Sequence, residues 1–406
     1  SYSFVALAAF ITRSGVIGSV HAFAGDSVSS VLFAALVAVP LVAGGIGLLF
    51  RWKDLAPNAS DGHLSAFVSR DAAYCLNNFF LVFAAAAIAY VTLAPALPEF
   101  LPLAGRTFGS DAFNAVARPL GLLYFALAAL CPLLSWGKTD GRRVLRRLRI
   151  PGACSLVLFA GLVAYHVLRI APGLEAAVES DPDMASGPLW YLNALAVAGY
   201  LIASVLLVSS LGMLCPSFLG HGACVRLRVG SLGSPLAHAG MAVMLAGLVG
   251  SSMFVNQQAI YLERPSSDSG MGSSAAIGDY LLVLEGDSID VAHDGSEVAN
   301  TALLKVYRGD HLAGEADPSI LVTATTGQQQ YRACVLGSPL EDLFIVYRGT
   351  APDGACVFDV RINPLIRCVW AGAALLLLGT GVAAFPATAS RRPNLPGIQG
   401  QINKTQ

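Results

Sequence analysis

Long apolar runs dominate the pattern of hydrophobic and polar positions along the chain. About 20 apolar residues are needed to cross the hydrocarbon core of a bilayer. Seven runs come close to that length and predict membrane-spanning helices, at approximately 30–50, 75–97, 118–136, 152–171, 189–214, 235–254 and 365–386. A shorter apolar stretch at 1–11 is expected to be the tail of a longer helix.

Segment 255–364 has a different pattern. Short runs rich in β-branched and aromatic residues alternate with Gly, Asp and Ser turns, which is typical of strands. The clearest are "YLLVLEG", "TALLKVYRG", "SILVTAT", "LFIVYRG" and "CVFDVRI". A segment of this length suffices for one small β domain. We therefore expect a β domain inserted between the last two membrane helices.

The basic residues predict how the chain is oriented. Fourteen Lys and Arg fall in the connecting segments 51–74, 137–151 and 215–234 and in the C-terminal tail, and only Arg13 and Arg106 fall in the short segments on the opposite side. Cytoplasmic loops carry the excess of positive charge. The basic side is therefore expected to be cytoplasmic, and segments 12–29 and 255–364 are expected to face outward.

Composition supports this organisation. The chain is 55% hydrophobic and 13% charged, whereas about 25% is usual in soluble domains. A net charge of −1 argues against nucleic acid as a partner. The predicted fold is a polytopic all-α membrane protein with an inserted extracytoplasmic β domain. Its expected parts are a membrane domain over 1–254 with an outer loop at 12–29, the β domain over 255–364, a last helix at 365–386 and a cytoplasmic tail at 387–406.

The cysteines exclude some classes of protein. There is no CxxC and no CxxCH, so the chain is neither a c-type cytochrome nor a thioredoxin-like protein. Cys334 and Cys356 both fall in the predicted outer domain, where a disulfide is chemically permitted. Each also lies within a strand-like run, so two separate buried thiols fit the sequence equally well.

Among the seven histidines, His238 stands out. It lies near the start of the helix "SPLAHAGMAVMLAGLVGSSMF", and an ionisable side chain at membrane depth is a functional hypothesis by default. Ala242, Ala246 and Gly250 follow it at four-residue steps on one helix face, which would leave room for a flat ligand. The alternative is ordinary small-residue helix packing, with the imidazole hydrogen-bonded to a carbonyl.

The other histidines give weaker signals. His166 is expected at the outer end of its helix in an interfacial role. Surface positions are expected for the loop and turn residues His63, His221, His293 and His311. His21 lies in the outer segment "TRSGVIGSVHAFA", among small residues that leave space for a ligand. It could equally cap its own turn through a backbone hydrogen bond.

Five stretches, in order along the chain, resemble motifs of the CcmF family of haem lyases, the cytochrome c maturation proteins. The first is "TRSGVIGSVHAFA", similar to the family's TRSGV–SVHAFA motif. The others are "SRDAAYCLNNFFLVFAAAAIAYVTLAPAL", "FNAVARPLGLLYFALAALCPLLSW", "LAHAGMAVMLAGLVGSS" and "INPLIRCVWAG". The resemblance runs from residue 12 to about residue 385 and covers the second half of a CcmF protein.

This resemblance implies a function. CcmF-like proteins attach haem to apocytochrome c on the outer side of the membrane. By its motif, His21 matches an outer histidine that holds the iron of the substrate haem, and His238 matches one of two membrane histidines that hold a separate haem b. The expected enzyme is a cytochrome c haem lyase in the inner membrane, with haem b as its cofactor.

The chain also departs from the family pattern. Its four tryptophans are scattered, so the tryptophan-rich WWD segment of the family is absent, as are matches to the other two histidines. The family's AHLG is AHAG here, and its GPPYFN turn is "FGSDAFN". The resemblance therefore implies an N-terminal half carrying the WWD segment, which is either a separate partner subunit or the missing part of a longer chain of which this sequence is a fragment. The other implied partners are a haem chaperone, and apocytochrome c with its thiol-reducing and presenting subunits.

No nucleophile is expected from this chain, because the thiols of a CxxCH peptide add across the vinyl groups of haem. The protein holds haem and peptide in register, which is a proximity effect. Two other classes fit parts of the pattern: a multi-pass transporter with an outer β domain, and a structural scaffold of a maturation complex. The runs show no paired Gly/Pro interruptions and almost no acidic or basic residues, whereas both features are typical of transporters.

Overall fold

The structure is a computed structural model that describes residues 2–13, 27–55, 66–181, 184–218, 229–265, 273–292 and 295–384. Within these residues, seven helical segments are long and apolar enough to cross a membrane, which confirms the predicted spans: Val31–Phe50, Arg70–Ala96, Ser110–Leu133, Arg149–Glu179, Leu189–Leu214, Leu232–Met253 and Ile366–Ala384. The chain divides into two compact units, Ser1–Leu145 and Arg146–Gln406.

Helices alone make up the described part of the first unit. They are α1 (Tyr2–Arg13), α2 (Ser27–Phe50), α3 (Trp52–Leu55), α4 (Arg70–Leu93) and α5 (Ser110–Leu130), with the 3₁₀ turns η1 (Ala94–Ala96) and η2 (Cys131–Leu133). Ser69 caps α4, because its hydroxyl accepts a hydrogen bond from the N–H of Ala72 at 3.1 Å. The start of α4 is tied to the segment after α5, where Gly137 donates its N–H to Asp71 Oδ2.

The second unit contains three helices packed side by side: α8 (Leu189–Phe218), α9 (Val229–Met253) and α10 (Ile366–Ala384). Glycine allows the close approach of α9 and α10. A Cβ at Gly240 would lie 2.5 Å from the backbone nitrogen of Leu376, and one at Gly372 would lie 2.4 Å from that of Met244. Because lipid cannot drive helices together, such small-residue packing is a main source of their association.

A fourth spanning segment changes its winding midway. Helix α6 (Gly141–Tyr165) passes through η3, a π turn over His166–Ile170, into α7 (Ala171–Ser180). Pro172, which has no N–H to donate, follows directly after this π turn. The helical segment therefore continues past the predicted end at residue 171.

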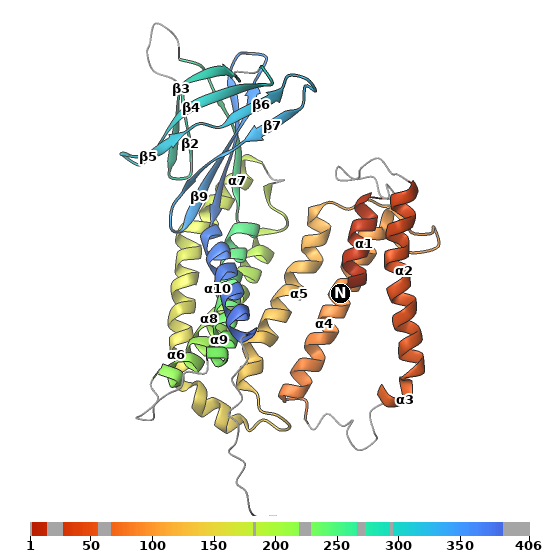
Figure 1. Ribbon diagram of the computed structural model, residues 1–406. Coiled ribbons are helices and arrows are strands. Elements are labelled where there is room, and N and C mark those ends of the chain that lie inside the picture. Colours follow the sequence, from red (N-terminus) through yellow and green to blue (C-terminus); the bar gives the residue numbers. More distant parts are fainter. Residues whose placement is uncertain are drawn as a thin grey trace, which may run out of the picture. The chain divides into compact units, whose positions relative to one another are not determined.

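The β domain lies between α9 and α10 in sequence, and its strands are all paired antiparallel (Figure 1). One sheet has the order β1-β10-β9-β8, and the other has the order β2-β3-β4-β6-β7 with β5 on β4. The strands are β1 (Asn256–Leu262), β2 (Ser274–Ile277), β3 (Tyr280–Val291), β4 (Glu297–Arg308), β5 (His311–Ala316), β6 (Ser319–Thr323), β7 (Gln329–Arg332), β8 (Cys334–Gly337), β9 (Glu341–Thr350) and β10 (Cys356–Pro364).

Both sheets contribute to one hydrophobic core. Leu282 and Leu284 from β3 and Leu304 from β4 are buried together with Tyr347 and Phe358 of the other sheet. The rings of Tyr347 and Phe358 have centroids 5.4 Å apart. The five strands predicted from apolar runs are all present, as β3, β4, β6, β9 and β10.

The two cysteines of this domain are separate thiols. Cys334 pairs with Ile345 on one side of β9, and Cys356 pairs with Thr350 on the other side. Five positions along a strand correspond to about 17 Å, which is far beyond the reach of a disulfide. The structure therefore favours the second of the two alternatives left open by the sequence.

Short connections join the domain to its helices. Two residues separate the end of α9 at Met253 from the start of β1 at Asn256. Leu365 alone separates β10 from α10, and it adopts a left-handed conformation with φ of 58°. Its N–H donates to the carbonyl of Leu340 at 2.6 Å.

Candidate functional site

His238 lies on α9, at the border between a buried and an exposed side of the helix. Ala239, Ala242 and Leu245 are buried in the unit that contains α8, α9 and α10. Ser234, one helical turn before His238, is exposed, and the imidazole itself is partly buried. A ligand or another protein surface therefore has access to this side of α9.

The imidazole of His238 has one nitrogen engaged by its own helix. Nδ1 lies 2.8 Å from the carbonyl oxygen of Ser234, so Nδ1 carries the proton and donates it. In that tautomer Nε2 carries the lone pair. A histidine that ligates a metal commonly donates its other ring N–H to a backbone carbonyl, which fixes the ring. The Nε2 lone pair of His238 would be able to bind a metal ion.

The row of small residues below His238 is used for packing. Ala242 is buried. A Cβ at Gly250 would lie 2.9 Å from the carbonyl oxygen of Pro364 and 3.2 Å from Leu365. This row therefore does not provide the room for a flat ligand that its spacing suggested. The exposed neighbour of His238 on its own helix face is Ser234, one turn away.

His21, the other predicted iron ligand, lies outside the described residues, as do His63, His221 and His293. His311 is exposed on β5, as expected for a surface histidine. Within the described residues, no group of three or more His, Cys, Asp and Glu side chains could hold a metal ion. The structure therefore brings no second ligand to His238 within the part that it describes.

His166 is much more enclosed than the sequence indicated. It is 2% exposed, at the first position of the π turn η3. Its Nε2 lies 2.8 Å from Asn193 Oδ1 on α8, so Nε2 donates and Nδ1 carries the lone pair, and Nδ1 is buried without a partner among the described residues. Phe254 and Tyr200 pack edge-on against the ring, at 4.5 Å and 5.5 Å between centroids.

Sequence reasoning placed His166 at an interface because it considered one helix at a time. The available signal was a pair of polar side chains, His166 and Asn193, in two apolar runs adjacent along the chain. His166 does not join His238 in one site. It contacts Phe254, which is sixteen residues from His238, and that spacing corresponds to about 24 Å along a helix.

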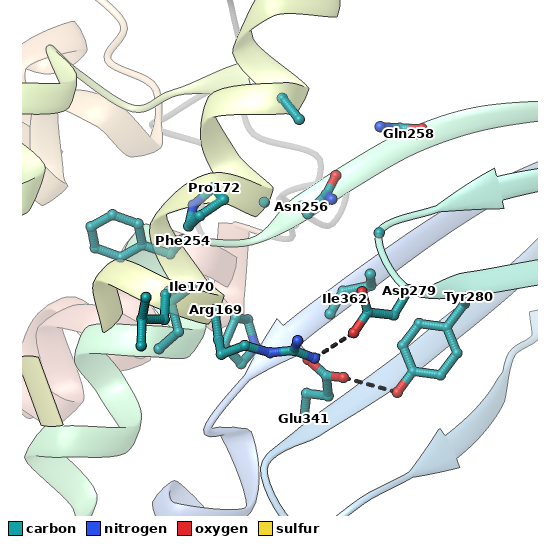
Figure 2. A pocket seen from close by; sticks show the side chains of 15 residues that line it. Arg169, Ile170, Pro172, Phe254, Asn256, Gln258, Asp279, Tyr280, Glu341 and Ile362 are labelled. Atoms are coloured by element: carbon teal, nitrogen blue, oxygen red, sulfur yellow. Dashed lines mark hydrogen bonds and ion pairs between the residues drawn. The ribbon is translucent and has the colours of Figure 1, made fainter. Parts of the chain in front are cut away.

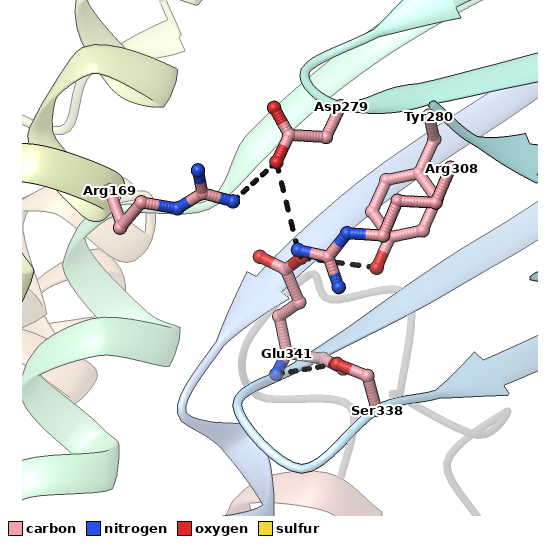
Figure 3. Close-up of polar contacts among 6 residues, drawn as sticks. All are labelled: Arg169, Asp279, Tyr280, Arg308, Ser338 and Glu341. Carbon is pink, nitrogen blue, oxygen red and sulfur yellow. Dashed lines mark hydrogen bonds and ion pairs between the residues drawn. The ribbon is translucent and has the colours of Figure 1, made fainter. Parts of the chain in front are cut away.

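A polar cluster lies where α7 meets the base of the β domain (Figure 3). Arg169 of η3 pairs with Asp279 in the turn between β2 and β3. Arg308 of β4 approaches both Asp279, at 3.7 Å, and Glu341 of β9, at 2.6 Å. Tyr280 donates its hydroxyl to Glu341 at 3.1 Å. Burial, together with the charge of Glu341, raises the pKa of Tyr280 to about 12, so this phenol stays a donor at neutral pH.

A cavity of about 330 Å³ opens beside this cluster (Figure 2). Arg169 and Pro172 line one side, and Asn256, Asp279 and Glu341 line the other. Its floor is apolar and includes Phe254, the residue that also packs on His166. The cavity therefore combines charges of both signs with a hydrophobic base.

Comparisons with known proteins find relatives that are similar to this chain over nearly its whole length. No protein-family model matches. The cytochrome c-type biogenesis protein CycK of Rhizobium meliloti is 27% identical over 379 residues, covering 93% of this chain and 52% of that protein. The cytochrome c-type biogenesis protein CcmF is 26% identical in Pseudomonas aeruginosa and 25% identical in Escherichia coli, covering 95% of this chain and 54% of each relative.

A solved structure, named cytochrome c heme lyase CcmF, shares the fold. It superposes with a TM-score of 0.61 at 19% identity, over 90% of this chain and 52% of that one. The chain thus spans about half the length of the relatives that it matches.

Proposed function

The chain belongs to the CcmF/CycK family of cytochrome c biogenesis proteins, and on this premise we propose that it acts as the C-terminal half of a cytochrome c haem lyase. The observation that carries the proposal is the similarity over 93% or more of the chain. The geometry of His238 supports it, because the bond from Nδ1 to Ser234 leaves Nε2 free to hold an iron.

In this proposal the Nε2 atom of His238 would hold the iron of a haem b. Bound haem would supply one-electron redox chemistry at its iron. The contribution of the chain is orientation. Ser234 fixes the ring and its tautomer, and the exposed position of Ser234 leaves an approach for the porphyrin and for the partner that provides the second ligand. That ligand belongs to a segment or chain other than the described residues.

His21 has the second role, which is to hold the haem that is being transferred. Each thioether forms when a thiol of the apocytochrome adds its S and H across a vinyl double bond, so no group is lost. The chain needs only to keep the two reactants together. The partners proposed for this step are an N-terminal half with the WWD segment, a haem chaperone, and apocytochrome c with the subunits that reduce and present it.

The proposed location is the inner membrane, with the β domain on its outer side. The excess of basic residues in the opposite loops supports this orientation. A cysteine at position 288, made as Ser288→Cys with the native cysteines replaced, should react with an impermeant reagent in cells with an opened outer membrane and an intact inner membrane. Reaction only after the inner membrane is permeabilised would reverse the orientation.

The haem site is tested on the chain purified together with its N-terminal half. The wild-type pair should show a b-type absorbance spectrum, and His238→Ala should abolish it while the protein remains inserted. His311→Ala, which removes an exposed histidine of the β domain, is the matched control and should leave the spectrum unchanged. A band that survives His238→Ala, or no band in the wild type, contradicts the proposal.

His21 is tested by maturation of a reporter cytochrome c in cells that lack the native enzyme. His21→Asn and His21→Gln should both fail, because these side chains form hydrogen bonds but are poor ligands of haem. Added imidazole should restore part of the activity. Full maturation with His21→Gln would show instead that His21 only caps its turn.

A further inference from the structure

The cavity at the base of the β domain lies at the level where the spanning helices end. Helix α9 ends at Met253 and α10 begins at Ile366. Phe254 and Pro364 line the cavity; Phe254 directly follows the first of these spans, and Pro364 lies two residues before the second. The cavity therefore opens near the boundary between hydrocarbon and headgroups.

Two exposed tryptophans also indicate that the cavity lies at the level of the lipid headgroups. Trp190 in the first turn of α8 is 74% exposed, and Trp370 near the start of α10 is 70% exposed. Exposed tryptophans near the ends of spanning helices are typical of the headgroup level of a membrane. Leu168, which also lines the cavity, is 72% exposed, so an apolar surface continues outward from its rim.

The charges around the cavity balance. Arg169 and Arg308 face the two carboxylates of Asp279 and Glu341. A ligand with a net charge would leave an excess of one sign in this partly buried place, whereas a zwitterion keeps the balance. A ligand that carries both signs is therefore the best match.

This cluster still has hydrogen-bond acceptors and donors that are not used. The ion pairs use Oδ2 of Asp279 and Oε1 of Glu341, and among the described residues no partner is found for Oδ1 or Oε2. Asn256 is 5% exposed and lines the cavity, and its Oδ1 is also without a partner in that part of the chain. Arg169 uses only Nη2 toward Asp279.

From these observations we propose that the cavity binds the phosphoethanolamine headgroup of a membrane phospholipid. An ammonium has three N–H donors, and the unused carboxylate oxygens of Asp279 and Glu341 would accept them. The phosphate would take the remaining N–H groups of Arg169, which form strong charge-assisted bonds with phosphate oxygens. The acyl chains would leave along Leu168 into the bilayer.

The site is expected to distinguish lipid headgroups by whether they carry a positively charged amine with N–H donors. A choline headgroup has the same charges but no N–H to donate, and glycerol headgroups lack the positive charge. Because hydrogen bonds to charged groups are strong, we expect retention of phosphatidylethanolamine to exceed that of phosphatidylcholine by at least about tenfold. The inference rests on Arg169, Asn256, Asp279 and Glu341 and does not depend on the proposed haem lyase function.

The test is native mass spectrometry of the full chain, purified from nanodiscs that contain equal parts of phosphatidylethanolamine, phosphatidylcholine and phosphatidylglycerol. The wild type should retain phosphatidylethanolamine. Asp279→Asn should reduce that retention at least about tenfold, since it removes a carboxylate that binds the ammonium. Asp287→Asn is the matched control, because Asp287 pairs with Arg264 elsewhere in the β domain and lines no part of this cavity.

A second variant fills the cavity without removing a charge. Gly173 lines it, and a Cβ there would lie 3.8 Å from Asn256, which is an ordinary contact. Gly173→Leu should therefore fold and should displace the headgroup. Equal retention of phosphatidylcholine, or full retention by both variants, would overturn the proposal. Competition by soluble O-phosphoethanolamine as effective as that by the lipid would overturn the membrane as the source.

Discussion

The two units of the chain differ in how they bury their apolar surface. In the first unit the described buried side chains are all small, as with Ala73, Ala94 and Ala129, and none of the apolar window of α2 is buried. In the second unit four aromatic side chains are fully enclosed: Tyr200, Phe254, Tyr347 and Phe358. The second unit thus has its own packed core, whereas lipid or another protein surface must cover the helices of the first.

The sharpest test of this difference is the loss of one large side chain in each unit. Phe358 is 0% exposed in the β core, so Phe358→Ala should lower the free energy of unfolding of that domain by about 3–5 kcal/mol. Phe100 in the first unit is 84% exposed, so Phe100→Ala should change stability by about 0.5 kcal/mol or less. Hydrogen exchange of the full chain measures both effects, at the amides of β9 and β10 for Phe358→Ala and at those of α4 and α5 for Phe100→Ala. Similar losses would erase the contrast.

The next test inserts bulk in place of glycine. A side chain at Gly240 meets the backbone of α10, so Gly240→Leu should push the helices apart and cost at least about 1–3 kcal/mol. Gly45 on α2 has no atom within 4 Å of an added Cβ, and Gly45→Leu should stabilise that helix by up to about 1 kcal/mol. Thermal unfolding of the detergent-solubilised chain should show opposite signs. If Gly45→Leu instead lowers stability, another surface must pack against the face of α2 that contains Gly45.

The smallest expected effect is a pH dependence of the β domain. Burial raises the pKa of Asp359, but the hydrogen bonds from Arg361 and Arg348 outweigh it, and the pKa is lowered below its ordinary value. The stability that this carboxylate contributes is therefore present at neutral pH and is lost as the pH falls through the lowered pKa, in the acid range below about pH 4. In this pH range the free energy of unfolding of the Asp359→Asn domain should therefore depend less on pH than that of the wild type. If the pH dependence is unchanged, other carboxylates cause it.

Much of the fold could be predicted because length and apolar pattern determine membrane spans directly. The strands that were missed are short or lie at edges. One example is β1, whose sequence "NQQAIYL" begins with three amide side chains. Apolar alternation is weak in such strands, because a neighbouring strand covers only one edge of β1 and long-range pairing with β10 defines it.

The site was predictable only in part, for a similar reason. His238 could be found from its motif and its isolation in an apolar run. The burial of His166 depends on Asn193 and Phe254, which come from two other segments. The cluster of Arg169, Asp279, Arg308 and Glu341 draws on residues up to 172 positions apart, so no local pattern marks it.

The short connections at the base of the β domain have a mechanical consequence. Leu365 alone joins β10 to α10, in a backbone conformation that costs roughly 1–2 kcal/mol for a residue with a side chain. Two residues join α9 to β1, and α9 and α10 are interlocked through Gly240 and Gly372. The domain and this helix pair therefore form one rigid body with no flexible linker between them. A force applied to the strands would tilt α9 and move His238, which lies toward the end of α9 that is away from the domain.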